Sequence, residues 1–161
     1  LLGPHTNPCN AKRQILGVYD KGLLKTFGNV SNLLKMHHVL VVHGNDGLDE
    51  ISITDKTFVT ELKDGNLNQF EIQPEDFGLS RANITALKAE TPEESLELIN
   101  AAFEGKESPV QDMISLNAGA SLYLSSASNS IKDGVNLAKE LLNNGKAKQT
   151  FSSYIEMTNS L

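Results

Sequence analysis

Residues 39–50, VLVVHGNDGLDE, are the segment from which we predict the fold. The segment begins with a run of apolar residues and ends, a few positions later, with two adjacent carboxylates. The β-branched run at 39–42 is typical of a strand covered on both faces, as in the parallel sheets of α/β proteins. We therefore predict that residues 39–42 are among the least exposed of the chain. Ligands of such sheets bind beyond the carboxyl ends of the strands, which is where GNDGLDE would lie.

The flanking segments predict the rest of the sheet. RQILGVYD (13–20) predicts a strand and residues 21–36 a helix with Asp20 as N-cap, so that strand, helix and strand form a βαβ unit. From Ile51 to Gln73 the apolar period becomes two, in ISIT, TFVTEL and LNQFEIQ, with turn residues at 63–66. The predicted fold is α/β, with a largely parallel sheet flanked by helices and an antiparallel hairpin over residues 51–73.

Helices are predicted after Pro74 from their end signals. Thr91, Ser108 and Ser130 each stand where a hydroxyl N-cap would begin a helix, and Gly105 and Gly145 stand where helices would end. The sequence contains no internal repeat and no long linker rich in Pro, Gly or Ser. We therefore predict one α/β domain over residues 1–161.

Composition limits the function. With 39% hydrophobic and 21% charged residues the chain reads as a soluble protein, and no apolar run approaches the roughly 18 residues of a membrane span. The net charge of −6 disfavours nucleic acid and membrane surfaces as partners. The single cysteine, Cys9, excludes an internal disulfide, so we expect a reducing compartment, the cytoplasm. Without an acid–base partner nearby in the sequence, Cys9 is interpreted as an inert thiol.

The acidic segment after the predicted central strand is the candidate site. Asp46, Asp49 and Glu50 bring three carboxylates together, and hard oxygen ligands of this kind select magnesium or calcium. Magnesium is commonly held by one or two carboxylates while phosphate and water complete its shell. A solvated turn is the alternative interpretation. His43 is interpreted as a hydrogen-bond donor to loop backbone, and no residue is assigned a catalytic role.

Several blocks of the sequence carry a family resemblance. They are LLGPHTNP, LGVYD, VVHGNDGLDE, PEDFGL, SLNAGASLYL and KDGVNLAKELLNNGKA. Together they resemble the carboxy-terminal portion of the anthranilate phosphoribosyltransferases, over essentially the whole chain. GLDE is the most specific, because the related pyrimidine nucleoside phosphorylases do not carry its acidic pair. The resemblance implies a transfer of phosphoribose from phosphoribosyl pyrophosphate to anthranilate in tryptophan biosynthesis, with Asp49 and Glu50 binding Mg²⁺.

The resemblance also implies what the 161 residues lack. The family's glycine-rich loop, its Lys-His-Gly-Asn segment, its anthranilate-binding arginine and its helical first domain, which carries the dimer contact, all precede LLGP. We therefore expect a homodimer for the full-length enzyme, an inactive isolated chain, and uncovered apolar surface around Leu1 and Leu2. His5 and Ala11 stand where the family usually has Leu and Pro. The alternative function is that of a noncatalytic, nucleic-acid-binding paralogue; the acidic balance and GLDE favour the enzyme.

Overall fold

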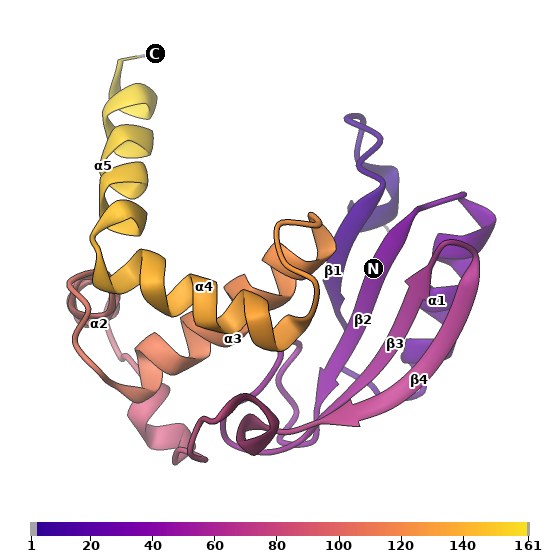
Figure 1. Ribbon diagram of the computed structural model, residues 1–161, viewed down its shortest axis with the longest axis horizontal. Helices are drawn as coiled ribbons and strands as arrows, with labels where there is room; N and C mark the ends of the chain where they lie inside the picture. Colours follow the sequence, from indigo (N-terminus) through magenta and orange to yellow (C-terminus); the bar gives the residue numbers. More distant parts are fainter. Residues whose placement is uncertain (1–2, 161) are drawn as a thin grey trace.

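The computed structural model describes residues 3–160, and a four-stranded sheet occupies the right-hand part of the molecule as drawn in Figure 1. The strands are β1 (Arg13–Gly17), β2 (His38–Gly44), β3 (Thr57–Lys63) and β4 (Asn66–Ile72), in the order β1-β2-β3-β4. The helices are α1 (Leu23–Leu33), α2 (Pro92–Phe103), α3 (Pro109–Leu124), α4 (Ile131–Asn143) and α5 (Lys146–Asn159). Short 3-10 helices span Gly3–Thr6, Pro74–Phe77 and Ile84–Leu87. The predicted apolar surface around Leu1 and Leu2 falls outside the described residues.

The predicted βαβ unit and its buried strand are confirmed. β1 pairs in parallel with β2, and α1 connects them. Val39 is 1% exposed, and Leu40, Val41 and Val42 are 0% exposed, because β2 is covered on both faces.

The α/β class and the antiparallel hairpin are confirmed, whereas the sheet is mixed rather than largely parallel. Within residues 3–160 the β1–β2 pairing is parallel, and both the β2–β3 and β3–β4 pairings are antiparallel. The predicted turn is present, with Asp64 and Gly65 at φ 49° and 81°. The hairpin therefore forms half of the sheet.

The ISIT segment is not a strand, which corrects the predicted start of the hairpin. Its backbone bonds to side chains instead of to a neighbouring strand: the amide of Ser52 donates to Thr57 Oγ1 at 2.9 Å, and that of Thr54 donates to Ser52 Oγ at 2.9 Å. Ile51 and Ile53 are buried in the core at 1% and 0% exposure. The alternation of apolar and polar residues in ISIT therefore reflects the burial of these two isoleucines and not a strand.

Two apolar clusters cover the two faces of the sheet. One lies between the sheet and α1 and contains Leu16, Val18, Leu24, Met36, Val39, Val41, Phe58 and Leu62. The other lies between the sheet and the α3–α4 side and contains Leu40, Val42, Ile51, Ile53, Val59, Ile72, Phe77, Leu79, Leu116, Ala120, Leu124 and Val135. Alternate residues of β2 thus enter opposite clusters, and the fold has three layers.

The predicted helix ends are confirmed with one correction. Thr91, Ser108 and Ser130 each accept a hydrogen bond from the amide three residues later. Gly105 and Gly145 have left-handed φ values of 76° and 78° after α2 and α4. The N-cap of α1, however, is Gly22 and not Asp20. Asp20 Oδ1 accepts from the Gly22 amide at 2.7 Å, in a turn that precedes the helix.

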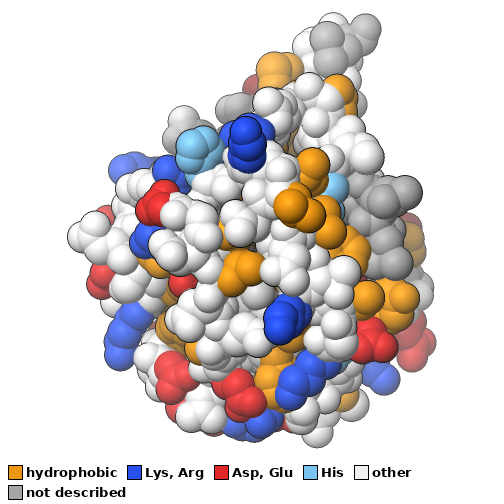
Figure 2. Space-filling model, turned by 90° about the vertical axis from the view of Figure 1, so that its right-hand side faces the viewer, with side chains coloured by type: hydrophobic (Ala, Val, Ile, Leu, Met, Phe, Trp, Pro, Cys, Tyr) orange, Lys and Arg blue, Asp and Glu red, His pale blue; other side chains and the backbone are white. Residues whose placement is uncertain are grey.

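Figure 2 shows the side of the molecule on which α1 and the β3–β4 hairpin lie, and the surface there is mixed in charge. Acidic, basic and apolar side chains are interspersed there. Among the described helices, none has the length and apolar character that crossing a membrane requires.

Candidate functional site: the acidic loop after β2

Asp49 and Glu50 lie in an exposed loop that follows the carboxyl end of β2, as predicted. Within residues 3–160, neither carboxylate makes a hydrogen bond or an ion pair. The loop itself, however, is held by hydrogen bonds among residues 46–57 and by contacts with two distant elements, β1 and α3. We refer to residues 45–56 as the acidic loop.

Gly17, the last residue of β1, lies directly beneath the backbone of Asp49. A Cβ atom at Gly17 would overlap the Asp49 carbonyl oxygen and lie within 2.6 Å of its carbonyl carbon. Only glycine allows so close an approach of a second backbone. The end of β1 therefore sets the position of the acidic pair.

Asn117 of α3 holds the residue that follows the pair. Its Oδ1 accepts from the Ile51 amide at 3.1 Å, and its Nδ2 donates to the Ile51 carbonyl at 2.9 Å and to the Met113 carbonyl at 3.1 Å. One side-chain amide thus satisfies both backbone groups of Ile51, in the way that a neighbouring strand would. The acidic loop is bound to α3 through this contact.

Asp46, the third carboxylate of the predicted cluster, has a structural role. Its carboxylate accepts hydrogen bonds from the hydroxyls of Ser52 and Thr54, and from the Leu48 amide at 3.1 Å. Partial burial acts to raise the pKa of Asp46, but these hydrogen bonds outweigh it and hold the pKa below its ordinary value. The carboxylate oxygens of Asp46 are therefore occupied within the loop, unlike those of Asp49 and Glu50.

A cavity of about 450 Å³ lies beside the acidic pair. It extends from the acidic loop to the segment around Ile84–Leu87 and to α2 and α3. The side chains that line it are those of Leu48, Asp49, Glu50, Ile84, Leu87, Lys88, Ala89, Ser95, Leu98, Ile99, Val110, Met113 and Ile114. Apart from the acidic pair, Lys88 and Ser95, the lining residues are apolar, so Asp49 and Glu50 contribute to the wall of a mainly hydrophobic cavity.

His43 and Cys9 do not join this site. The imidazole of His43 donates from Nδ1 to the Val18 carbonyl at 2.8 Å, which confirms the predicted bond to loop backbone. Cys9 is an exposed free thiol in the amino-terminal segment. Sequence reasoning missed Gly17 and Asn117. A local signal for Asn117 is its place inside a helix, because asparagine is more common at helix caps and turns, but this signal does not identify its partner.

The donor set suits a shared metal ion. In the part of the chain that the structure describes, no group of three or more His, Cys, Asp or Glu side chains is arranged to hold a metal. Two carboxylate donors with free oxygens match the share that a protein commonly supplies to Mg²⁺ when a phosphate ligand supplies the rest. Asp49 and Glu50 therefore fit a magnesium ion that is bound together with a phosphate compound.

The sequence matches a known family along most of its length. The profile of the glycosyl transferase family, a/b domain, matches residues 1–148. The chain belongs to this glycosyl transferase family. The match includes β1, β2, the acidic loop and α3, so the contacts of Gly17 and Asn117 lie within the family's domain.

Relatives of this glycosyl transferase domain are longer proteins. The anthranilate phosphoribosyltransferase of Methanobrevibacter smithii is 44% identical over 160 residues, which cover 99% of this chain and 48% of the relative. The crystal structure of anthranilate phosphoribosyltransferase from Thermus thermophilus matches with a TM-score of 0.87 and 35% identity, over 96% of this chain and 46% of that one. The chain thus spans about half the length of the relatives it matches.

One similar structure contains ligands. The anthranilate phosphoribosyltransferase of Saccharomyces cerevisiae in complex with PRPP and Mg is 28% identical, with a TM-score of 0.82, over 92% of this chain and 43% of that one. These ligands belong to the yeast protein.

Proposed function

We propose that this chain is the carboxy-terminal portion of an anthranilate phosphoribosyltransferase, which transfers phosphoribose from phosphoribosyl pyrophosphate to anthranilate. The family match and the similarity to the Methanobrevibacter smithii and Thermus thermophilus proteins support the reaction. The observation that carries the proposal is the acidic pair: Asp49 and Glu50 are exposed, free of partners among the described residues, and mounted on a fixed loop.

Asp49 and Glu50 would hold the magnesium ion that accompanies phosphoribosyl pyrophosphate. The ion would supply stabilisation of the negative charge that gathers on the departing pyrophosphate. The chain's own contribution is position: Gly17 and Asn117 fix the loop, so the two carboxylates are oriented before the substrate binds. Because anthranilate has a free amine lone pair, no strong general base is needed, which agrees with the lack of an assigned catalytic residue.

We further propose that the 161 residues do not catalyse the reaction in isolation, because they span about half of each relative. The full-length enzyme would act as a homodimer through its helical portion. An exposed free thiol at Cys9 suits a reducing compartment, for which we propose the cytoplasm. The prediction of one domain over residues 1–161 stays a prediction.

The test removes the two negative charges in a full-length enzyme that carries this sequence. Asp49→Asn with Glu50→Gln keeps the size of both side chains and removes the anions. We expect a normal fold, a shift of the magnesium dependence to higher concentration, and a loss of kcat/KM on the order of 100-fold, since metal stabilisation is worth several kcal/mol. Steady-state kinetics over a magnesium titration measure both effects.

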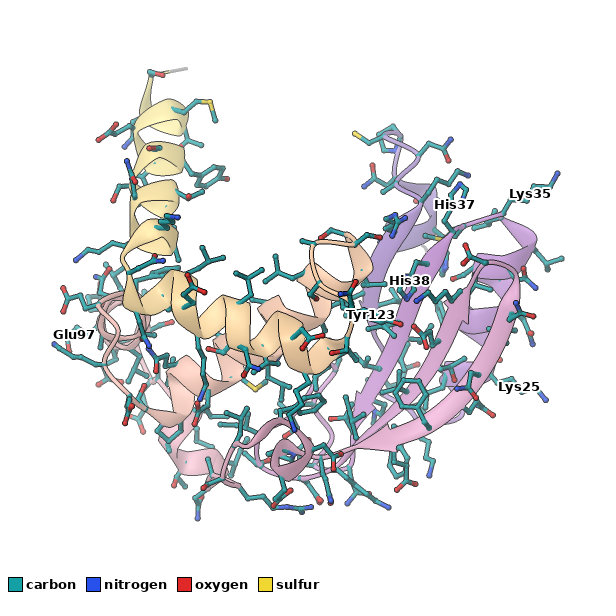
Figure 3. All side chains as sticks on the ribbon, viewed as in Figure 1. Lys25, Lys35, His37, His38, Glu97 and Tyr123 are labelled. Atoms are coloured by element: carbon teal, nitrogen blue, oxygen red, sulfur yellow. The ribbon has the colours of Figure 1, made fainter. Side chains whose placement is uncertain are left out.

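The matched control is Glu97→Gln with Glu156→Gln, which removes two exposed charges from α2 and α5. Figure 3 shows Glu97 on α2, on the helical side of the molecule and away from the sheet. The control should keep the wild-type rate and magnesium dependence. If the Asp49→Asn, Glu50→Gln enzyme also kept them and lost only stability, the pair would be a structural feature of the loop.

A further inference from the structure

Three basic residues lie opposite one another at the end of the sheet that is farther from the acidic loop. Arg13 at the start of β1 pairs with His38 at the start of β2, and His38 pairs with Lys63 at the end of β3. Residues directly opposite on adjacent strands project from the same face of a sheet. The register therefore places Arg13, His38 and Lys63 in one row, which we call the basic row.

The basic row faces the end of α3. Arg13 Nη1 donates to the Leu124 carbonyl at 2.5 Å and to Ser126 Oγ at 2.9 Å. Lys63 Nζ donates to the Tyr123 hydroxyl at 3.1 Å, and the His38 ring meets the Tyr123 ring edge-on at 4.8 Å between centroids. Figure 3 shows His38 and Tyr123 together between the sheet and the helical layer. All three basic side chains are thus fixed by contacts with one segment.

Charge in the basic row is only partly compensated. Glu61 Oε1 lies 2.7 Å from His38 Nε2 and also accepts from the Tyr123 hydroxyl at 2.9 Å, so this carboxylate is committed to His38. Neither Arg13 nor Lys63 forms an ion pair with another residue of the described part of the chain. The carboxylates of Glu61 and Asp64 act on Lys63 electrostatically, and both contribute to its raised pKa after the larger effect of Tyr123. An anion in contact with Arg13 and Lys63 would give both residues the ion pair that they lack among the described residues.

Donor groups remain available on both unpaired residues. The guanidinium of Arg13 uses Nη1 for its two contacts, which leaves the N–H groups of Nε and Nη2. The ammonium of Lys63 has three N–H groups, of which one donates to Tyr123. The bond to Tyr123 is the main reason why the pKa of Lys63 lies above its ordinary value, so the amine carries its charge.

A polar cavity of about 220 Å³ lies against the basic row. His37, Ser126, Ser128 and Asn129 line it together with the row, and Asp64 is the one carboxylate among its lining residues. β2 separates this cavity from the acidic loop by six residue steps, or about 20 Å at 3.3 Å per residue. The cavity is therefore a separate place from the proposed magnesium site.

We propose that this cavity is a binding site for a phosphate group. Guanidinium, ammonium, imidazole, hydroxyl and amide donors surround it from the strand ends and from the α3–α4 connection. Donors from several directions match the tetrahedral set of oxygens of a phosphate, and arginine pairs with two of those oxygens at once. A planar carboxylate would use fewer of these donors.

Titration of the 161-residue chain with inorganic phosphate tests the site. Amide shifts in the NMR spectrum are followed at constant ionic strength, with sodium chloride exchanged for phosphate and with acetate as a second ligand. We expect saturable shifts around residues 13, 37, 63 and 126–129, and weaker binding of acetate. Lys63→Gln should lower the phosphate affinity about tenfold or more, because a charged donor is lost. Arg13→Lys, which keeps the charge, should weaken it less than Arg13→Gln.

Lys25→Gln is the matched control. Lys25 is exposed on α1, on the other side of the sheet, and Figure 3 shows it pointing away from the row. This variant removes the same charge and should bind phosphate as the wild type does. Shifts that fail to saturate, equal affinity in Lys63→Gln and Lys25→Gln, or acetate binding as tight as phosphate would each overturn the proposal. Shifts confined to residues 45–56 would do so as well, because they would place the anion at the acidic loop.

Discussion

The backbone of Asp49 rests on Gly17, so closely that any side chain at position 17 would overlap the Asp49 carbonyl group. Two segments more than thirty positions apart in the sequence therefore meet main chain to main chain. The position of the magnesium-binding pair proposed above depends on a residue that carries no functional group at all.

Gly17→Ala should destabilise the protein, because the added methyl forces the acidic loop away from β1. Overpacking of this kind costs about 1–3 kcal/mol in the free energy of unfolding, which urea denaturation measures. Gly3→Ala is the control, since a Cβ there would meet no described atom within 4 Å. Equal urea midpoints for the two variants would contradict the close contact.

Asn117→Ala should also loosen the acidic loop. The substitution leaves both backbone groups of Ile51 without their partner, and each unsatisfied buried group costs about 1–3 kcal/mol. Asn136→Ala, on the exposed face of α4, should be neutral or slightly stabilising because alanine favours a helix. Thermal unfolding of the two variants gives the comparison, and amide exchange at Ile51 reports the local effect. An unchanged exchange rate at Ile51 would show that Asn117 does not hold the acidic loop in place.

Asp46→Asn should lower stability by about 1 kcal/mol at neutral pH, because an amide replaces an acceptor of two hydroxyl bonds. The pKa of Asp46 is lower in the folded than in the unfolded chain, so the carboxylate's contribution is complete above the ordinary pKa of 3.8 and is lost as the pH falls through the folded pKa. The difference between wild type and variant should therefore shrink in acid. Asp64→Asn, at an exposed turn, serves as control, and a pH-independent difference would refute the assignment.

His5 should make stability depend on pH near neutrality. Burial lowers the pKa of His5 below 6.5, and its ring stacks on Phe27 at 5.3 Å between centroids while Nε2 lies 3.0 Å from Ser31 Oγ. The unfolded chain then binds the proton more readily, so stability is complete above pH 6.5 and falls as the pH drops through the folded pKa. His5→Leu removes this dependence. Melting temperatures of both proteins between about pH 5 and pH 8 test it, and parallel curves would count against it.

The sequence predicted those features that are decided by neighbours along the chain. The unbroken apolar run made β2 recognisable, and the hydroxyl caps at Thr91, Ser108 and Ser130 marked helix starts, because each depends on residues within a few positions. The exposed acidic pair was predicted for the same reason. The local pattern gave a wrong prediction for ISIT. Its apolar and polar residues alternate as in a strand, but its backbone amides donate to the side chains of Thr57 and Ser52.

The missed features join segments that are distant in sequence. Asn117 and Ile51 are 66 positions apart, and nothing in either segment alone indicates that the amide of one will bind the backbone of the other. The mixed sheet was missed for a related reason: the pattern of β2 reports burial on both faces and not the direction of its neighbours.

The acidic loop places the proposed magnesium ligands next to core residues, because the free carboxylates of Asp49 and Glu50 are followed within three positions by Ile51 and Ile53, which are 1% and 0% exposed. Lifting this segment as a lid would bring both isoleucines into water. Any conformational gate at the proposed magnesium site must therefore come from another part of the protein, because residues 49–53 cannot move without opening the core. Amide hydrogens at Ile51 and Ile53 should accordingly exchange only when the surrounding core opens.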